Sequence, residues 1–377
     1  MSIQVPSYIE QLKPYIAGKP IEETQREYGV KRVIKLASNE NPLGPSPKAV
    51  AAIKKSMKDL QLYPDASGYR LRHALAKLEK VSFEEIVLGN GSNEVIELLI
   101  RSFCVPGDFM VASDGVFAAY PISARIQGVD TLFSRMTQDY RFDLPAMVEL
   151  IRSNPRVKLV AIPNPNNPTG TYVTERELTS FLSEVEKVRD GSVHVILDYA
   201  YWEYVSAKDL PDPVGLYRKF SNVSVLKTFS KIYGLGGLRV GYGIMRNDLA
   251  KYVQKVRMPF NVSGPGLVGA EAALADKEFI RKSIRINREG MKSMKKFFTD
   301  LGVPFLPSQG NFFLINTRQG FGMSGPEVFE ACLRLGVIFR PVANYGLPDW
   351  LRVTVGTPAQ NRVAQKAFLS LKKHKNR

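Results

Sequence analysis

Two lysines, Lys227 and Lys231, stand after the apolar run "VSVL" and before the glycine-rich stretch "GLGGLRVG". A lysine at the end of a buried strand can act as a nucleophilic amine, or it can be an ordinary basic residue. Thr228, Ser230 and Arg239 add two hydroxyls and a guanidinium to the same short segment. This combination of groups suits a phosphate ester with a reactive carbonyl nearby.

A second candidate for anion binding follows the apolar run 86–88. The sequence there is "GNGSNE", in which two glycines permit a tight turn and Ser92 or Asn93 can cap the following helix. The first N–H groups of such a helix are free to bind an anion. The alternative is an ordinary strand–turn–helix connection with a good N-cap, and the motif alone does not separate the two.

Three more apolar runs end in polar or aromatic residues. Residues 109–111 are followed by Phe117, residues 158–162 by the turn "PNPNNPTG" with Asn167, and residues 193–197 by Asp198. A carboxylate placed directly after a buried strand needs a partner, so Asp198 should face a cation. The alternatives are a plain turn around Asn167 and a helix cap or a structural ion pair at Asp198.

The elements that must position these groups are short β-branched runs alternating with amphipathic segments. Strands are expected at 86–88, 109–111, 158–162, 193–197 and 223–226, with helices at 93–103 and 175–188 between them. This alternation predicts an α/β fold with a mostly parallel sheet flanked by helices on both faces. Residues 35–270 are expected to form the large domain. Residues 1–34, irregular and proline-bearing, and 271–377, which open with one long helical pattern, are expected to form a smaller α+β domain.

Ligands bind beyond the carboxyl ends of the strands in such sheets, so the polar groups above should meet at one edge. Together they match the needs of pyridoxal 5'-phosphate: a lysine for its aldehyde, a carboxylate for its ring nitrogen, and N–H and hydroxyl donors for its phosphate. A dinucleotide fits less well. The third glycine of G-x-G-x-x-G is replaced by Arg239 in one glycine-rich stretch and by Glu94 in the other.

The composition of the 377-residue chain is ordinary for a globular protein, with 44% hydrophobic and 23% charged residues. No apolar run is long enough to span a bilayer, the N-terminus lacks a signal-peptide pattern, and the two cysteines lie in apolar surroundings, so we expect a cytoplasmic protein. The formal charge of +16 comes from basic residues scattered over expected helix faces. We therefore expect anionic small molecules rather than nucleic acid as partners, no membrane association and no metal.

Over nearly its whole length the chain resembles the fold-type-I pyridoxal-phosphate-dependent aminotransferases, which implies that the sheet of the large domain is of the seven-stranded type. The resemblance rests on "IKLASNENPLGPSP", "LYPD", "GNGSNE", "NNPTG", "LDYAY", "KTFSKIYGLGGLRVG", "VIFRPVANYGLP" and "LRVTVGT". Within this group, the "ASNENPLGPSP" entry and the "LRVTVGT" ending are similar to the branch that acts on histidinol phosphate. The resemblance implies transfer of an amino group from histidinol phosphate to 2-oxoglutarate in histidine biosynthesis, giving imidazole-acetol phosphate and glutamate by a ping-pong mechanism.

The resemblance also implies roles for individual residues. The Schiff-base lysine would be Lys231, leaving Lys227 as an ordinary cation. Asp198 would hold the ring nitrogen, and Tyr201 and Asn167 the ring hydroxyl. Phe117 would stack on the ring. The catalytic residues would thus be Lys231, Asp198 and Tyr201.

The remaining implied contacts concern the phosphate of the cofactor and the substrate. The cofactor phosphate would be bound by Ser92, Asn93, Ser230 and Arg239. The substrate would be bound by Arg352, which matches the carboxylate-binding arginine of transaminases, and by further residues: Tyr15, Asn167, Arg340 and Tyr63. Tyr63 would reach into the site of the partner subunit, which implies a homodimer whose site is shared across the interface.

Three positions depart from the usual pattern of these enzymes: Tyr199, Asn93 and Asn344, where Glu, Asp and Gly are common. None of them is a central catalytic group, but they leave the substrate assignment open. The alternatives are an aromatic amino-acid transaminase on the same scaffold, a phosphothreonine decarboxylase and a non-catalytic basic binding protein.

Overall fold

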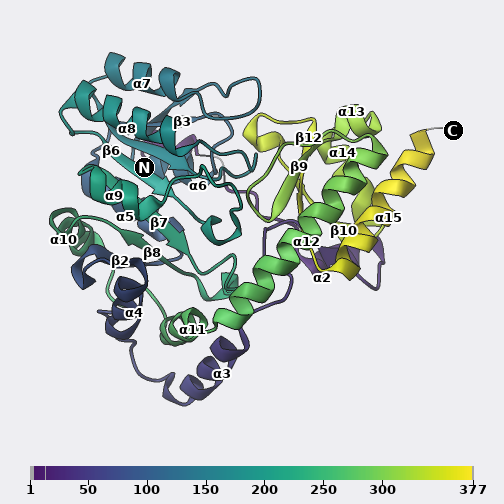
Figure 1. Ribbon diagram of the computed structural model, residues 1–377, viewed down its shortest axis with the longest axis horizontal. Helices are drawn as coiled ribbons and strands as arrows, with labels where there is room; N and C mark the ends of the chain where they lie inside the picture. The colour runs from purple at the N-terminus through teal and green to yellow at the C-terminus, as the bar shows by residue number, and fades with distance from the viewer. Residues whose placement is uncertain (1–3, 13, 376–377) are drawn as a thin grey trace.

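The larger part of the molecule, on the left in Figure 1, is built around a seven-stranded sheet. The computed structural model describes residues 4–12 and 14–375. From edge to edge the strands of this sheet are β2 (Ile86–Asn90), β8 (Val240–Ile244), β7 (Val223–Thr228), β6 (His194–Asp198), β5 (Val157–Pro163), β3 (Phe109–Ser113) and β4 (Asp130–Ser134). Strand β8 runs antiparallel to both of its neighbours, and all the other neighbouring pairs are parallel. The mostly parallel α/β sheet predicted from the sequence is therefore confirmed.

The sheet is buried on both faces, which is why the sequences of its strands are nearly continuous apolar runs. In β5, Val160 and Ile162 belong to one hydrophobic cluster, whereas Leu159 and Ala161 belong to another. Because successive side chains of a strand point to opposite faces, the two clusters lie on opposite sides of the sheet.

Helices cover both of these faces. One face packs against α5 (Ser92–Phe103), α6 (Ala119–Ile126) and α10 (Asn247–Val256). The other packs against α4 (Tyr69–Glu79), α7 (Leu144–Ser153), α8 (Glu175–Arg189), α9 (Pro213–Lys219) and α11 (Gly264–Leu274), and α3 (Pro47–Ser56) packs on α11. The five strands and two helices expected in this region are present, each within a few residues of its predicted limits.

A second, smaller core lies on the other side of the long helix α12 (Lys277–Leu301), to the right in Figure 1. It contains a three-stranded antiparallel sheet in the order β11 (Arg340–Pro341), β12 (Trp350–Thr354) and β9 (Phe312–Asn316). The short strands β1 (Ile34–Lys35) and β10 (Val337–Ile338) pair beside it. The helices of this part are α2 (Ile21–Tyr28), α13 (Thr317–Phe321), α14 (Gly325–Arg334) and α15 (Pro358–Lys375), and a single turn, α1 (Ser7–Glu10), lies against α6.

Helix α12 takes part in both cores. Ile280 and Ile284 near its start pack against the core of the large sheet, whereas Met294 and Phe298 belong to the smaller core. The division of the chain into domains of residues 35–270 and 1–34 with 271–377 stays a prediction.

Four expectations about elements need correction. Strands β4 and β8 were not foreseen, because β4 is a half-exposed edge strand and β8 carries two glycines. Gly241 in β8 is required for packing, since a Cβ there would lie 2.2 Å from the backbone N of Ser92. Residues 21–28, expected to be irregular, form α2, and the long helical pattern is broken at Asp276, whose carboxylate caps α12 by accepting the N–H of Phe279 (3.4 Å).

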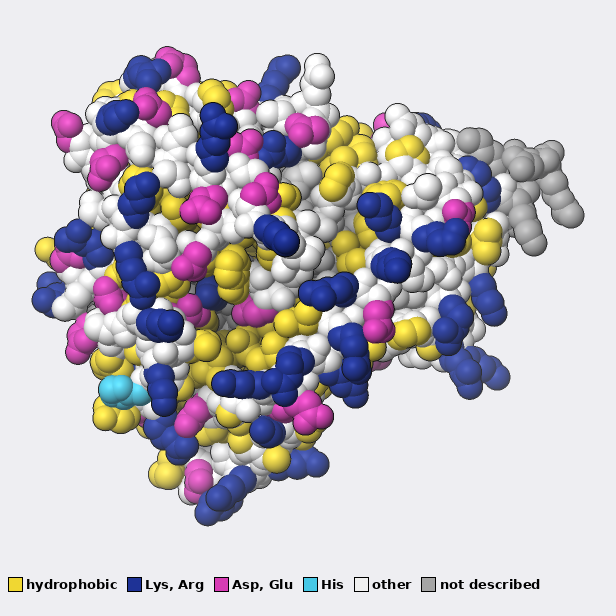
Figure 2. Space-filling view, in the orientation of Figure 1, with side chains coloured by type: hydrophobic (Ala, Val, Ile, Leu, Met, Phe, Trp, Pro, Cys, Tyr) yellow, Lys and Arg dark blue, Asp and Glu magenta, His cyan; other side chains and the backbone are white. Residues whose placement is uncertain are grey.

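Two further properties concern the length of the helices and the distribution of surface charge. None of the helices within the described residues is long and apolar enough to cross a membrane. Lys and Arg side chains are spread over the face seen in Figure 2, with Asp and Glu between them, so the positive charge forms no single patch on that face.

Candidate active site

A cavity of about 290 Å³ lies at the carboxyl ends of the parallel strands, between the large sheet and the smaller core. Ligand sites in open α/β sheets are expected at this edge. Twelve of the thirteen residues predicted from the sequence line it: Tyr15, Ser92, Asn93, Phe117, Asn167, Asp198, Tyr201, Ser230, Lys231, Arg239, Arg340 and Arg352. These residues come from ten different segments of the chain, and the fold brings them together.

Asp198 ends β6 and is a buried carboxylate at the floor of the cavity. It accepts hydrogen bonds from the hydroxyl of Tyr120 (3.1 Å) and the N–H of Ala200 (3.0 Å). Burial raises the pKa of Asp198 to about 6 because the charged form loses its hydration. Within the described part of the chain no basic side chain pairs with it, so the carboxylate is available to a cationic group of a ligand. Tyr120 is a residue of the site that the sequence analysis missed.

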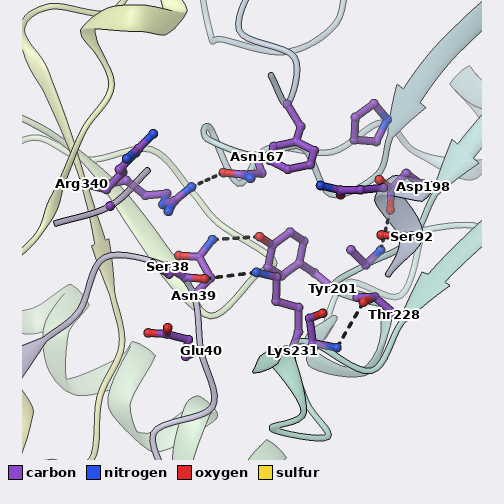
Figure 3. A pocket seen from close by; sticks show the side chains of 18 of the residues that line it. Ser38, Asn39, Glu40, Ser92, Asn167, Asp198, Tyr201, Thr228, Lys231 and Arg340 are labelled. Carbon is purple, nitrogen blue, oxygen red and sulfur yellow. Dashed lines mark hydrogen bonds between the residues drawn. The ribbon is translucent and has the colours of Figure 1, made fainter. Parts of the chain in front are cut away.

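Lys231 faces the same cavity. Its Nζ donates a hydrogen bond to the carbonyl oxygen of Ser38 (3.1 Å), a contact drawn in Figure 3. Burial, reinforced by the positive charges of Arg352 and Arg239, lowers the pKa of the Lys231 amine to about 8. A lysine with such a pKa is partly in the neutral, nucleophilic form close to neutral pH.

The start of α5 and the turn around Arg239 form a cradle of hydrogen-bond donors. Arg239 has left-handed backbone torsions (φ 55°), and its Nη1 donates to the carbonyl oxygen of Gly236 (2.9 Å) and to Oγ of Ser230 (3.4 Å). Its Nη2 lies so close to Gly91 that a Cβ at residue 91 would be 2.5 Å away. The guanidinium is thereby held beside the N-terminus of α5, where Ser92 begins the helix and the helix dipole favours an anion.

Asn167 and Tyr201 lie on the side of the cavity nearer the small sheet (Figure 3). The side-chain oxygen of Asn167 accepts a hydrogen bond from Arg352, which also donates to the carbonyl oxygen of Ala37. The hydroxyl of Tyr201 accepts a hydrogen bond from the side-chain amide of Asn39 (2.8 Å). Asn39 is part of the "ASNENP" motif, but nothing in that motif assigned it a role, and this contact was missed.

Arg340 and Arg352 face each other across two antiparallel strands. The register of β11 and β12 pairs Arg340 directly with Arg352, which puts both side chains on the same face of the small sheet. Both are buried and both line the cavity. Arg340 also donates to the carbonyl oxygen of Ile16 (2.8 Å), and its guanidinium lies 5.7 Å from the ring centre of Tyr15. The result is a pocket with two positive charges and one tyrosine.

Tyr63 is the predicted site residue that does not line the cavity. Its side chain is 83% exposed and stacks on Phe260, with 4.7 Å between the ring centres. A role in the site of a partner subunit stays a prediction.

Lys227, expected to be an ordinary cation at a strand end, is instead buried. Its Nζ lies 2.8 Å from both carboxylate oxygens of Glu79 at the end of α4, and it does not line the cavity. Because successive side chains of β7 alternate between faces, Lys227 points away from the face that carries Thr228.

The residues present fit pyridoxal phosphate. Asp198 is a buried carboxylate that still needs a cation, Lys231 is an amine with a lowered pKa, and the cradle at Arg239 is an anion site with close backbone approach at Gly91. These are the three contacts that the ring nitrogen, the aldehyde and the phosphate of this cofactor require.

The comparisons with known proteins agree with this chemistry. The family model "Aminotransferase class I and II" matches residues 31–368. The chain is 47% identical to histidinol-phosphate aminotransferase of Anaeromyxobacter sp. (strain Fw109-5), over 95% of this chain and 96% of that one. It is 44% identical to histidinol-phosphate aminotransferase of Bdellovibrio bacteriovorus, over 97% of each chain.

Solved structures share the fold. The histidinol-phosphate aminotransferase of Sinorhizobium meliloti in complex with pyridoxal-5'-phosphate superposes with a TM-score of 0.88, covering 99% of both chains at 24% identity. The aspartate aminotransferase of Thermus thermophilus with maleate superposes with a TM-score of 0.84 at 17% identity, over 98% of this chain and 100% of that one. At these identities the likeness concerns the fold alone.

Proposed function

The chain belongs to the class I and II aminotransferases and is a pyridoxal-phosphate-dependent enzyme, and from this premise we propose that it transfers the amino group of histidinol phosphate to 2-oxoglutarate. The single observation that carries the choice of substrate is the direct pairing of Arg340 with Arg352 across β11 and β12. Two guanidiniums on one face suit a phosphate dianion, and either of them can donate hydrogen bonds to the carboxylate of an oxo acid. The two curated relatives described above carry the same activity in their names.

Each residue has a definite task in this reaction. Bound pyridoxal phosphate supplies an electrophilic carbon for the substrate nitrogen and a ring that accepts an electron pair. The neutral amine of Lys231 would take the proton from the substrate carbon that bears the nitrogen and, in its ammonium form, would give it to the aldehyde-derived carbon of the cofactor. Asp198 would keep a proton on the ring nitrogen, and Asn167 and Tyr201 would hydrogen-bond the ring hydroxyl.

The remaining residues bind and orient. Ser92, Asn93, Ser230 and Arg239 hold the phosphate of the cofactor, and Phe117 packs against its ring. Arg340, Arg352 and Tyr15 bind the phosphate of the amino donor. Because the phosphate of the cofactor and the phosphate of the substrate are each bound, the reacting carbon is held next to Lys231. This supplies the orientation that such a reaction needs.

We also propose that the enzyme is a homodimer whose partner subunit contributes Tyr63, and that it works in the cytoplasm. Large apolar side chains around Tyr63 are exposed in the single chain, among them Leu60 (55%), Leu62 (65%), Met258 (64%) and Phe260 (42%). An apolar surface of this kind is typical of an interface. Mixing Lys231→Ala with Tyr63→Ala protein and allowing subunits to exchange should restore activity at about a quarter of the sites, since a C2 hybrid has one intact site.

A donor screen tests the substrate. The purified enzyme is assayed with 2-oxoglutarate and, in turn, with histidinol phosphate, histidinol, phenylalanine and tyrosine, and glutamate is measured. We expect kcat/KM for histidinol phosphate to exceed that for histidinol by about a hundredfold or more, because two charge-assisted contacts are lost without the phosphate. Activity with phenylalanine or tyrosine equal to or above that with histidinol phosphate would instead identify an aromatic transaminase.

A pair of variants shows whether the arginines account for this preference. Arg340→Met removes one guanidinium from the cavity, and Arg318→Met serves as the matched control, because Arg318 is an exposed residue of α13 paired with Asp349. Arg340→Met should reduce the advantage of histidinol phosphate over histidinol at least tenfold, whereas Arg318→Met should leave it unchanged.

A further inference from the structure

Asn39 is a fully buried residue in the segment that follows β1, between the small sheet and the large one. Its backbone has left-handed torsions (φ 56°), a conformation in which asparagine is one of the few tolerated non-glycine residues. Its side chain lies between Thr354, the last residue of β12, and Tyr201, which follows β6. Asn39 therefore links the two sheets at the edge of the cavity.

The hydrogen bonds of Asn39 have a defined direction. Its backbone N–H donates to Oγ1 of Thr354 (3.0 Å), so the threonine hydroxyl accepts there and has its own proton to give. That hydroxyl donates to Oδ1 of Asn39 (2.9 Å), which identifies the other end of the amide as the NH₂ group. The NH₂ group donates to the hydroxyl oxygen of Tyr201 (2.8 Å; Figure 3).

A hydroxyl that accepts from Asn39 must direct its own proton elsewhere, and the cavity is the open side of Tyr201. We propose that Asn39, held by Thr354, is a positioning residue that makes Tyr201 a hydrogen-bond donor toward the cavity, and so toward an oxyanion such as the ring oxygen of pyridoxal phosphate. The identity of that oxyanion rests on the proposed function. The direction of the hydroxyl does not.

The groups around Tyr201 are compatible with this role. Arg352 from β12, Asp198 from β6, Tyr345 from η5 (Ala343–Tyr345) and Lys231, whose Nζ is 5.7 Å from the ring centre, face it from the surrounding elements. Burial raises the pKa of Tyr201 to about 12, while the positive charge of Arg352 and the hydrogen bond from Asn39 act in the opposite direction. The phenol is therefore protonated at neutral pH and has a proton to donate.

The arrangement also connects the substrate end of the cavity to the cofactor end. Arg352 and Thr354 are two residues apart on β12 and share one face of the strand, whereas Leu351 and Val353 between and beside them belong to the small core. One strand face thus carries both the guanidinium that meets the substrate anion and the hydroxyl that orients Asn39.

The direction of the Tyr201 hydroxyl can be measured in the cofactor-free, full-length protein. Position 201 is replaced by 3,5-difluorotyrosine, whose lower phenol pKa brings its titration into a range where the chain stays folded, and the titration is followed by 19F NMR. In Asn39→Asp a carboxylate replaces the amide donor, so we expect the midpoint to rise by at least one pH unit, a tenfold change in the ionisation constant. An unchanged or lower midpoint would overturn the proposal.

A second pair of variants keeps the test decisive where Asn39→Asp does not fold. Thr354→Val has the same shape as threonine without the hydroxyl, so the amide of Asn39 loses its fixed orientation, whereas Thr354→Ser keeps the hydroxyl. We expect Thr354→Val to raise the titration midpoint and to weaken binding of added pyridoxal phosphate about tenfold, and Thr354→Ser to restore both to wild-type values. Equal behaviour of the two variants would overturn the proposal. Neither readout involves turnover, so a failure of the donor screen leaves this test intact.

Discussion

Lys227 and Lys231 stand four residues apart and have opposite surroundings. The Nζ of Lys227 lies 2.8 Å from both oxygens of Glu79, and Glu79 also accepts the hydroxyl of Tyr242 (2.6 Å). Among the described residues, the Nζ of Lys231 hydrogen-bonds only to a neutral acceptor, the carbonyl oxygen of Ser38, while burial and two arginines lower the pKa of its amine. Lys227 is in direct contact with its counter-ion, whereas no carboxylate among the described residues is in contact with the amine of Lys231.

This difference separates a structural lysine from a reactive one. A carboxylate in contact stabilises the ammonium form and removes the lone pair that a nucleophile needs. A buried amine without such a partner is costly to the fold but is poised to react. Burial alone does not distinguish the two lysines, whereas the presence of a carboxylate does.

The largest effect is expected on removing the reactive amine. Lys231→Ala should lower kcat for transamination about ten-thousandfold or more, over ~5 kcal/mol of transition-state stabilisation, because the group that moves the proton is gone. Steady-state assays with histidinol phosphate measure this. Borohydride reduction of the cofactor-loaded wild type, followed by peptide mapping, should label Lys231 and leave Lys227 unmodified.

The matched control is Lys227→Met, which removes the other lysine. Its folded fraction should still become labelled at Lys231 and turn over at a rate within a few-fold of wild type. Label on Lys227, or wild-type turnover by Lys231→Ala, would reverse the assignment of the two lysines.

The second effect concerns stability. Lys227→Met leaves the carboxylate of Glu79 buried without a counter-ion and should lower the free energy of unfolding by about 3 kcal/mol, measured by urea denaturation of the cofactor-free protein. Adding Glu79→Gln should recover most of this loss, because the glutamine is neutral and still accepts the hydroxyl of Tyr242. A double variant no more stable than Lys227→Met would mean that the ion pair is not the cause.

The contrast between the lysines also marks what sequence alone can predict. Lys231, Asp198 and Ser92 could be identified because each stands at or just after the carboxyl end of a strand in a mostly parallel sheet, and such ends meet at one edge. Asn39 and Thr354 were missed, because they are 315 positions apart and neither stands in a local pattern that demands a partner.

The same limit applies to the fold around the site. The partner of Lys227, Glu79, is 148 positions away on another helix, so that buried ion pair could not be read from the strand end. Strand β8 resembled a turn because Gly241 must admit the backbone of Ser92, which is a packing requirement and not a local preference.

The third effect extends the comparison to the carboxylates. Glu79 has a lysine in contact, whereas within the described residues Asp198 has only the hydroxyl of Tyr120 and one backbone N–H, and burial raises its pKa to about 6. Asp198→Asn should lower kcat about a hundredfold, ~2.7 kcal/mol, because a neutral amide does not keep the ring nitrogen protonated. The urea midpoint of the cofactor-free protein should not fall, since an uncompensated buried charge is removed. A fall comparable to that of Lys227→Met would give Asp198 a structural role.

The smallest effect is the pH dependence of the reaction with pyridoxal phosphate, which we expect to follow the protonation of Lys231 and not that of Lys227. Cofactor-free protein is mixed with pyridoxal phosphate, and the rate of the absorbance change is followed from pH 6 to 9.5. Below its pKa of about 8 Lys231 is mostly protonated, so the neutral fraction, and with it the rate, should rise about tenfold per pH unit and level off above pH 8.

Arg352→Gln removes a positive charge that lowers the pKa of Lys231, so the plateau of this variant should begin at higher pH. In Lys227→Met the plateau should not move, because Lys227 already has its counter-ion in Glu79. A plateau that moves in Lys227→Met but not in Arg352→Gln would mean that the Lys227–Glu79 ion pair, and not the charges around the cavity, sets the pKa of Lys231.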